Sequence, residues 1–296
     1  MTYLISVTTF TLITCIVVVG LYIMTGLTGM FSLGQASIMA VGAYASGLVM
    51  KKLSFPFPVA VLFAIVLALI IAYIISKPIM RLRRDYFTLV TLAMGEAVIA
   101  FLNAADGLTG GALGLVAIPK KTTVTLILVT LLIGIWMARN FCKSRYGRMC
   151  IATRADELAS GSMGINVYQV KTRSFLIAAG FASLAGAYYA SYVTYIDPSM
   201  FAWRKSGEWV IMMFFGGVNS LTGSIFSTIL LNVLPEALRF ADNYRYTMYA
   251  ILVLFVINFR PNGLFGHWEI FDLFNKDSRA AKKMKKAAAA KGGNTK

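Results

Sequence analysis

Residues 26–47 read GLTGMFSLGQASIMAVGAYASG, a combination that ordinary soluble helices and loops do not show. The stretch lies within a strongly apolar chain, yet it is rich in glycine, alanine, serine and threonine and contains a glutamine. In lipid, small side chains allow the backbones of two helices to approach closely. Small residues recur at helical spacing along one face of the helix that we expect here, at Ala36, Ala40, Ala43 and Gly47. The stretch therefore predicts a tightly packed membrane helix.

The composition of the whole chain supports a membrane location. Of 296 residues, 58% are hydrophobic and 14% are charged, whereas soluble domains are about half apolar and about a quarter charged. Apolar runs of bilayer-spanning length recur along the chain. We expect spans near 4–24, 33–50, 57–76, 86–103, 122–138, 174–193, 209–233 and 247–259. The predicted fold class is all-α: a polytopic membrane protein with about 8–10 transmembrane helices, including a broken or re-entrant segment. We expect the first span to be retained, not cleaved as a signal peptide.

Basic residues are concentrated in three segments: 77–85, 139–173 and a tail that begins at Lys276. Basic flanks of transmembrane helices stay in the cytoplasm, so we expect these segments inside and 104–121 outside. Lys51 and Lys52 fit less well, because alternation of the spans places them outside. The prediction is a transmembrane domain over 1–274 and a basic, disordered cytoplasmic tail over 275–296. Such basic patches suit anionic membrane lipids, and nucleic-acid binding is disfavoured because no soluble domain is large enough to present a groove.

The segment 209–233 conflicts with this orientation if it crosses the membrane once, because the next span would then deliver the Lys-rich tail outside. We therefore predict two short helices that meet at the break GGVNSLTG, residues 216–223, and return to the outside, where Asp242 would lie. Broken backbone at membrane depth occurs where it is buried in protein or lines a cavity. In transporters it often marks the substrate path, so Gly217, Asn219 and Ser220 are candidate path residues.

Two interpretations of 26–47 stay open: packing alone, or packing around a translocation path. Ser32 and Gln35 have the spacing of a capping box, which predicts a helix that starts at Leu33. NSLTGS at 219–224 is similar to FSLGQA at 31–36, which suggests a weak internal repeat. The candidate path residues in this stretch are Gly34, Gln35, Ser37, Ala40 and Ala43.

Glu96 is the acidic residue that falls within a predicted span, and it joins the candidate path residues. An ionisable group at that depth is costly and suggests function, although a neutral glutamic acid that joins two helices is the alternative. The chain contains no GxxxxGK[ST], HExxH or GxSxG motif, and Cys15, Cys142 and Cys150 lack metal or redox spacing. We therefore expect no catalytic, metal or cofactor site. A membrane-embedded enzyme that uses Glu96 and Asp85, and a purely structural assembly subunit, are alternatives from other classes.

The loop 139–173 is expected to be helical around 152–163 and to break at Gly164, as a docking knob for a cytoplasmic partner would be. Five motifs now follow in order: SLGQASIMAVGAYASG, MRLRRDYFTLVTLAMGE, RYGRMCIATRADELASGSMGINVYQVK, GGVNSLTGSI and NFRPNGLFG. Together they closely resemble the permeases of branched-chain amino-acid ABC importers, the LivM-like subgroup. The resemblance runs from about residue 20 to residue 266. The Lys-rich tail is a departure from it.

The resemblance implies a transport subunit of the bacterial inner membrane, without its own ATPase site, for leucine, isoleucine and valine. It implies a second, LivH-like permease, two cytoplasmic ATPases and an external substrate-binding protein as partners. Another small solute, such as urea or a different amino acid, is the alternative substrate, because specificity in such systems rests largely with the binding protein. The segment ELASGSMG matches the ATPase-coupling segment of the family. The coupling residues it implies are Glu157, Leu158, Ala159, Met163 and Gly164.

Overall fold

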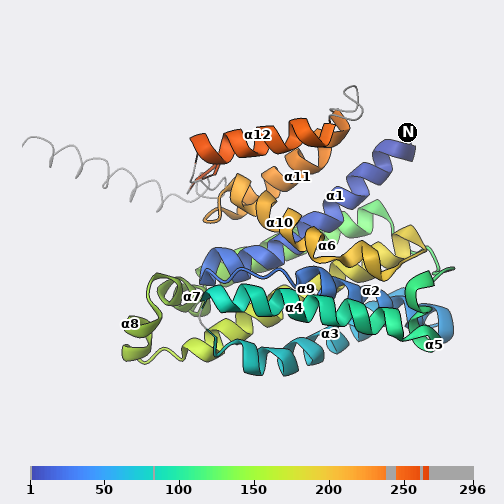
Figure 1. The fold of residues 1–296 in the computed structure, drawn as a ribbon, viewed down its shortest axis with the longest axis horizontal. Helices are drawn as coiled ribbons and strands as arrows, with labels where there is room; N and C mark the ends of the chain where they lie inside the picture. Colours follow the sequence, from blue (N-terminus) through green and yellow to red (C-terminus); the bar gives the residue numbers. More distant parts are fainter. Residues whose placement is uncertain (1, 83, 238–244, 261–262, 267–296) are drawn as a thin grey trace, which may run out of the picture.

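The computed structural model describes residues 2–82, 84–237, 245–260 and 263–266, and this part of the chain is helical with no strand (Figure 1). Five helices in this described part are long and apolar enough, by length and composition, to cross a membrane. They are α1 (Thr2–Leu21) with its π-helical continuation η1 (Tyr22–Leu27), α3 (Phe57–Ile79), α4 (Arg84–Ala104), α6 (Val124–Lys143) and α9 (Val167–Val193). The all-α polytopic prediction is confirmed.

Shorter helices complete the bundle. Those of intermediate length are α2 (Gln35–Lys52), α10 (Trp203–Gly216), α11 (Leu221–Ala237) and α12 (Arg245–Phe259). Short elements at the ends of the long helices are α5 (Asp106–Thr109), η2 (Gly111–Leu113), α7 (Arg145–Ala155), α8 (Glu157–Ser162) and η3 (Pro198–Phe201). The predicted spans coincide with these helices to within about five residues, except that α9 starts at Val167 instead of near residue 174 and α10 starts at Trp203 instead of near residue 209.

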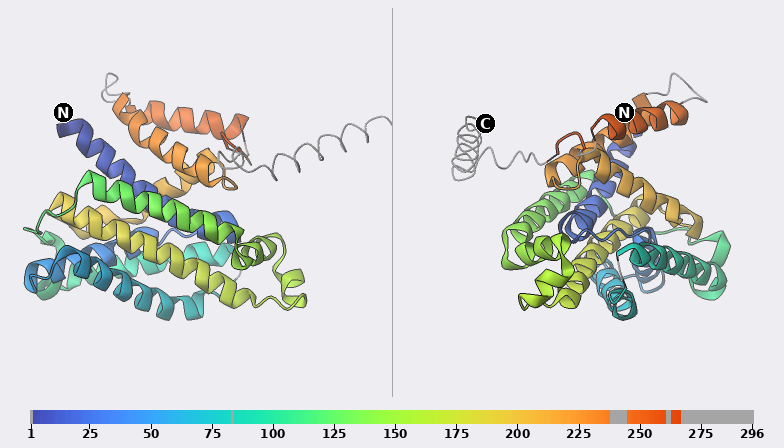
Figure 2. Two further views of the ribbon diagram at one scale, coloured as in Figure 1. Left: turned by 180° about the vertical axis from the view of Figure 1, so that it is seen from behind. Right: turned by 60° about the vertical axis from the view of Figure 1, so that its left-hand side comes forward.

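The centre of the bundle is the crossing of α2 and α9, which pack against each other most extensively (Figure 2). Gly42 of α2 lies against the backbone of Ser183, and Gly186 of α9 lies against Met39 and Ala43. A Cβ atom at either glycine would collide with the facing backbone, so the two helices can touch because these positions lack side chains. The small-residue stretch thus has its predicted packing role.

The bundle has two distinct ends. At one end, called the α8 end, lie α7, α8 and the break between α10 and α11 (Figure 1). At the other, the α5 end, the chain after η2 pairs with the loop before η3 through the isolated bridge between Leu115 and Ile196. Tyr44 of α2 also donates to the Ile196 carbonyl, at 3.4 Å. The long helices therefore run between two ends of different construction.

The helices α10 and α11 form the predicted hairpin. Gly217, which ends α10, has a φ of 109°, and α11 returns along α10, so that Ser227 donates to the Met212 carbonyl at 2.6 Å. After α12 the chain comes back to the break, where Leu264 N–H donates to the Phe215 carbonyl at 2.9 Å. The end of the described chain thus lies at the α8 end, as the hairpin requires. Asp242 and the tail 275–296 lie outside the described residues.

The capping-box prediction is wrong. The helix α2 starts at Gln35, its N-cap is Gly34, and no side chain caps it. Ser32 Oγ accepts instead from the neighbouring Gly34 N–H, at 3.2 Å. The spacing fits a box, but contacts of Phe31 and Leu33 with Thr88 and Thr91 of α4 keep the chain non-helical from residue 29 to Gly34.

Candidate functional site

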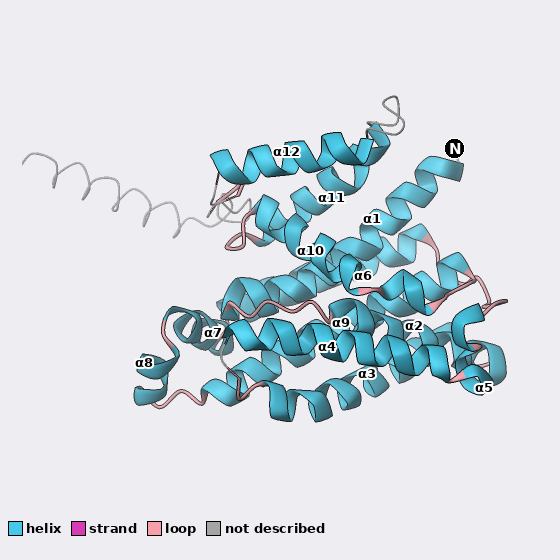
Figure 3. Cartoon of the chain, in the orientation of Figure 1, coloured by secondary structure: helices cyan, strands magenta, loops and turns pink. Residues whose placement is uncertain are grey.

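A non-helical segment enters the interior of the bundle before α2 begins (Figure 3). Its backbone is bound by side chains of neighbouring helices. Leu33 N–H donates to Thr91 Oγ1 of α4 at 3.3 Å, and Thr88 Oγ1 donates to the Phe31 carbonyl at 2.9 Å. Thr91 follows the first residue of α4 by seven positions, so the segment reaches about 10 Å into the bundle. Backbone at this depth is tolerated because protein groups satisfy it.

The first residues of α2 are sealed in the interior. Ala36 N–H donates to Ser206 Oγ of α10 at 2.8 Å, and Ser37 Oγ donates to the Gly34 carbonyl at 2.7 Å. Gln35 is fully buried, and its Nε2 lies 3.6 Å from the sulfur of Met24. Its Oε1 has no hydrogen-bond partner among the described residues. Gly34, Gln35 and Ser37 therefore gather where α2, α4 and α10 meet.

Ala40 and Ala43 lie deeper, and both are fully buried among apolar neighbours. Ala43 N lies 2.9 Å from the position of a Cβ on Gly186. Gly47, further along α2, faces Leu115 and Ile118. In this conformation the small-residue face of α2 is occupied by packing within the subunit.

Glu96 lies apart from this group. It sits twelve positions after the first residue of α4, a 21-residue helix, and so lies near its middle, with its side chain on the exposed face of the subunit. Ala93, Ala97 and Ala100 are exposed on the same helix, whereas Gly95 faces inward to Gly34. No hydrogen bond or ion pair engages Glu96 within the part of the chain that the structure describes. A carboxylate in the middle of a span is costly against lipid, so this face needs a polar or protein environment.

The break between α10 and α11 holds the remaining candidate path residues. Ser220 is buried and its Oγ accepts from Gly223 N–H at 3.0 Å, which caps α11. Asn219 is exposed, and its Oδ1 accepts from Arg154 Nη1 of α7 at 2.5 Å. Sequence analysis does not predict this role of Arg154. In the sequence it is one of several basic residues of the loop 139–173, and nothing in its local pattern indicates a partner 65 positions away.

The loop 139–173 forms two helices instead of one. The helix predicted around 152–163 is interrupted at Asp156, which caps α8: its Oδ1 accepts from the N–H groups of Leu158 at 2.8 Å and Ala159 at 3.1 Å. Leu158 is 86% exposed and Met163 is 83% exposed. Gly164 then ends the turn with a φ of 81°. The α8 tip, defined here as residues 157–164, projects from the bundle with two bare apolar side chains.

The α8 tip is fastened to the bundle by charge. Glu157 Oε2 accepts from Lys171 Nζ of α9 at 2.6 Å, and the lysine side chain is 5% exposed.

On α7, the sulfur of Cys150 lies 3.4 Å from Ser174 Oγ of α9. Burial raises the pKa of the Cys150 thiol, although the hydrogen bond to Ser174 acts in the opposite direction.

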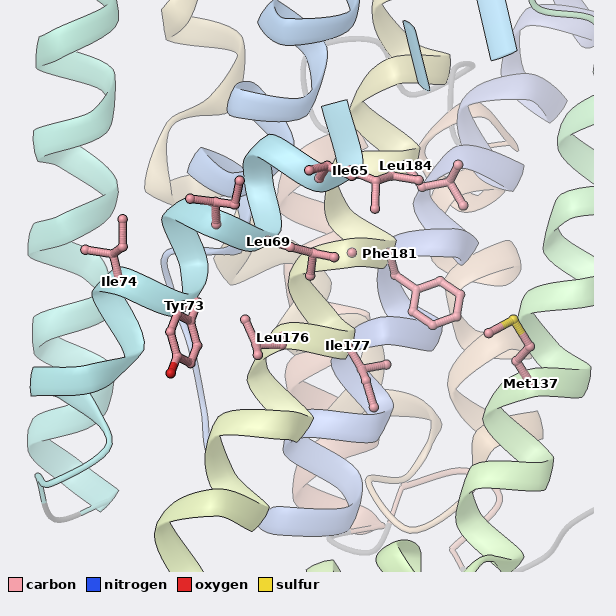
Figure 4. A pocket seen from close by; sticks show the side chains of 12 residues that line it. Ile65, Leu69, Tyr73, Ile74, Met137, Leu176, Ile177, Phe181 and Leu184 are labelled. Carbon is pink, nitrogen blue, oxygen red and sulfur yellow. The ribbon is translucent and has the colours of Figure 1, made fainter. Parts of the chain in front are cut away.

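A hollow with a volume of about 820 Å³ lies between α3, α6 and α9 (Figure 4). Aliphatic and aromatic side chains line it, with Phe181 and Leu69 near its centre (Figure 4). A zwitterionic amino acid would find no charge complement there, whereas lipid acyl chains fit such a surface. None of the candidate path residues lines this groove.

Comparison with known protein families identifies the family of this chain. A model of the family described as "Branched-chain amino acid transport system / permease component" matches residues 3–257. The chain belongs to this family of permeases. Among the described residues, no cluster of His, Cys, Asp and Glu could hold a metal ion. No solved structure matches the chain.

Individual relatives agree with the family. The high-affinity branched-chain amino acid transport system permease protein LivM of Escherichia coli is 28% identical over 294 residues, which cover 88% of this chain and 69% of that protein. The corresponding LivH of Salmonella typhimurium is 24% identical, over 86% of this chain and 92% of that protein. A probable LivM of Methanocaldococcus jannaschii is 20% identical, over 69% of this chain and 67% of that protein.

Proposed function

We propose that this chain is the LivM-like permease subunit of an ATP-driven importer of leucine, isoleucine and valine, with no ATPase site of its own. The family match over residues 3–257 and the relatives named LivM and LivH support it. The partners would be a LivH-like permease, two cytoplasmic ATPases and an external substrate-binding protein, in the bacterial inner membrane.

The α8 tip is the structural feature that supports the proposal of ATPase partners. Leu158 and Met163 extend into solvent from a short, capped helix whose base is fixed to α9 by an ion pair. Together these two exposed side chains offer an apolar surface that a protein contact would bury. One of the two ATPases would take these side chains into a surface pocket and move the α8 tip when nucleotide binds.

The orientation follows from charge. The α8 end carries Lys77, Arg81, Arg139, Lys143, Arg145 and Arg148, and basic flanks remain on the cytoplasmic side. The end of α12 leads to the same side. The Lys-rich tail would therefore be cytoplasmic, next to anionic lipid headgroups.

The substrate path would run along the exposed face of α4, between this subunit and the LivH-like permease. Glu96 lies on that face at mid-membrane depth, where its carboxylate could pair with the ammonium group of an amino acid. The sealed start of α2, with Gly34, Gln35 and Ser37, lies on the inner side of α4, next to Gly95. Its helix N-terminus favours a carboxylate. Opening of this contact would complete the path, with the break at Gly217, Asn219 and Ser220 at its cytoplasmic end.

Reconstitution tests the proposal. The chain is expressed with its LivH-like permease and two ATPases, placed in proteoliposomes and supplied with binding protein and radiolabelled leucine. ATP should drive leucine accumulation that excess valine, but not urea, suppresses. Glu96→Gln should lower uptake at least tenfold, whereas Glu208→Gln, which alters an exposed acid on α10, should not. Uptake suppressed by urea, or the absence of ATP-driven uptake by the complete complex, would refute the proposed substrate or function.

A further inference from the structure

Arg154 makes two contacts that no local pattern explains. Its Nη1 donates to Asn219 Oδ1, in the break between α10 and α11, and also to the carbonyl of Gly26, in η1. Both distances are 2.5 Å. One guanidinium nitrogen thus joins two segments that are 193 positions apart in the sequence, the difference between 219 and 26.

Both partners lie where a membrane helix departs from α geometry. Gly26 belongs to the π-helical turns that end α1, shortly before the non-helical segment that leads to α2. Asn219 belongs to the break that follows Gly217. The two segments also touch each other, because Tyr22 lies 3.5 Å from the Asn219 carbonyl and Gly26 faces the Val218 carbonyl. Arg154 therefore binds both irregular segments where they meet at the α8 end.

Arg154 is also close to the α8 tip along the chain. It occupies the last turn of α7, and Asp156, two positions later, is the N-cap of α8. Because α7 and α8 share this single capped junction, a shift of α8 is transmitted to the last turn of α7. A guanidinium remains charged at all physiological pH values, and hydrogen bonds from a charged donor are among the strongest in proteins.

We propose that Arg154 is a positioning residue that links the movement of the α8 tip to both irregular membrane segments at once. In this conformation it holds the end of η1 and the α10–α11 break together. When the α8 tip moves, Arg154 either carries the two segments with it or releases them. Either event changes the cytoplasmic end of the proposed path, which includes the segment before α2 and the break before α11. The inference rests on the proposed function, because it needs an ATPase that moves α8.

Two other interpretations of the same contacts do not fit their acceptors. A surface ion pair is excluded for these contacts, because both acceptors are uncharged oxygens. A simple helix C-cap is also excluded, because the acceptors belong to other elements and not to α7. The arrangement is instead a three-way junction between the coupling loop and two helix breaks, and a small displacement at such a junction can switch packed elements between two positions.

The experiment compares variants of the reconstituted complex by leucine molecules imported per ATP hydrolysed. Arg154→Ala should assemble and hydrolyse ATP within about twofold of the wild type, yet its import per ATP should fall at least tenfold. Arg154→Lys keeps a charged donor and should recover part of the ratio, whereas Arg154→Gln should not. Arg148→Ala is the matched control, because Arg148 lies on the same helix and donates to the nearby Lys143 carbonyl, at 2.9 Å.

Asn219→Ala removes one acceptor from an exposed position and should lower import per ATP in the same direction. It keeps the inference falsifiable if Arg154→Ala does not assemble. Wild-type import per ATP in Asn219→Ala, or in an assembled Arg154→Ala complex, would overturn the inference. Equal losses in Arg148→Ala would overturn it too. Lack of ATP-driven import by the wild-type complex would refute the proposed function, which is a separate outcome.

Discussion

Lys171 and Glu157 form an ion pair, with Nζ 2.6 Å from Oε2, that joins α9 to the first residue of α8. The lysine side chain is 5% exposed and the glutamate side chain 34%. A buried ammonium group needs a counter-charge, so loss of the glutamate leaves an uncompensated charge. The pair therefore fixes the base of the α8 tip, and its effect can be measured apart from any contact with an ATPase.

We predict that Glu157→Gln destabilises the purified subunit by about 2 kcal/mol, below the range for fully buried pairs because the glutamate is partly exposed. Thermal unfolding in detergent measures this change. The double variant Glu157→Leu with Lys171→Leu should recover most of the loss, because no charge is then left buried. A double variant less stable than Glu157→Gln would contradict this account of the pair.

Gly164 and Gly161 offer a matched pair of substitutions. A Cβ on either glycine meets no atom within 4 Å, but only Gly164 of these two has a positive φ, of 81°. Valine at 164 should therefore strain the backbone by about 1–2 kcal/mol and reorient the turn, so that ATP hydrolysis is uncoupled from import. Gly161→Val should behave nearly as wild type. Equal import per ATP in the two variants would show that the turn conformation does not matter.

Cysteines at Leu158 or Met163 should cross-link to an ATPase subunit, because both side chains are more than four-fifths exposed on the α8 tip, at 86% and 83%. The native Cys150 should not interfere. Its pKa is raised by burial, so little reactive thiolate forms near neutral pH and labelling should increase only at higher pH or after unfolding. Mass spectrometry of maleimide-treated complex checks both statements. Cross-links in a cysteine-free control, or none from either site, would contradict the prediction.

The sequence predicted the helices well because most apolar runs are bounded by charges, prolines or glycines. The hairpin at 209–233 follows from charge together with the glycine-rich break at 216–223, since a single crossing would move the Lys-rich tail to the wrong side. The interruption at Asp156 was missed, although aspartate before two helical N–H groups is a common N-cap. The signal is present in the sequence, but the helical pattern on both sides of Asp156 hides it.

The candidate site was predicted less completely, since its contacts depend on the third dimension. Periodicity placed Ala40 and Ala43 on one small-residue face, and the structure shows that face packed within the subunit. No spacing rule could show that Glu96 points away from the subunit, or that Arg154 meets Gly26 and Asn219. Such facts depend on which helices become neighbours, and a single sequence does not record this.

The orientation can be tested with two glycines in open surroundings at opposite ends of the bundle, Gly107 in α5 and Gly161 in α8. In a cysteine-free background, Gly107→Cys should react with a membrane-impermeant thiol reagent added to intact cells. Gly161→Cys should react only after the membrane is opened. The sequence-based prediction adds Asp242→Cys to the outer group and Ser278→Cys to the inner one. The reverse pattern would invert the orientation and remove the cytoplasmic dock.

The last prediction separates packing from path at the small-residue face of α2. Ala40→Leu adds three carbons to a fully buried position, and such overpacking costs about 1–3 kcal/mol unless the helices separate. We expect lower yields of assembled complex and a lower unfolding temperature, with leucine import lost as a consequence. Ala43→Leu should behave alike, because Ala43 lies at the α2–α9 crossing.

Val41→Leu is the control for Ala40→Leu and Ala43→Leu, because Val41 is a half-buried residue of the same helix and gains one methylene. It should leave assembly and import near wild type. If Ala40→Leu assembles fully, keeps its basal ATP hydrolysis and still loses leucine import, the added side chain must block a space that opens during transport. That result would place Ala40 on the path and would mean that α2 and α9 separate during the cycle.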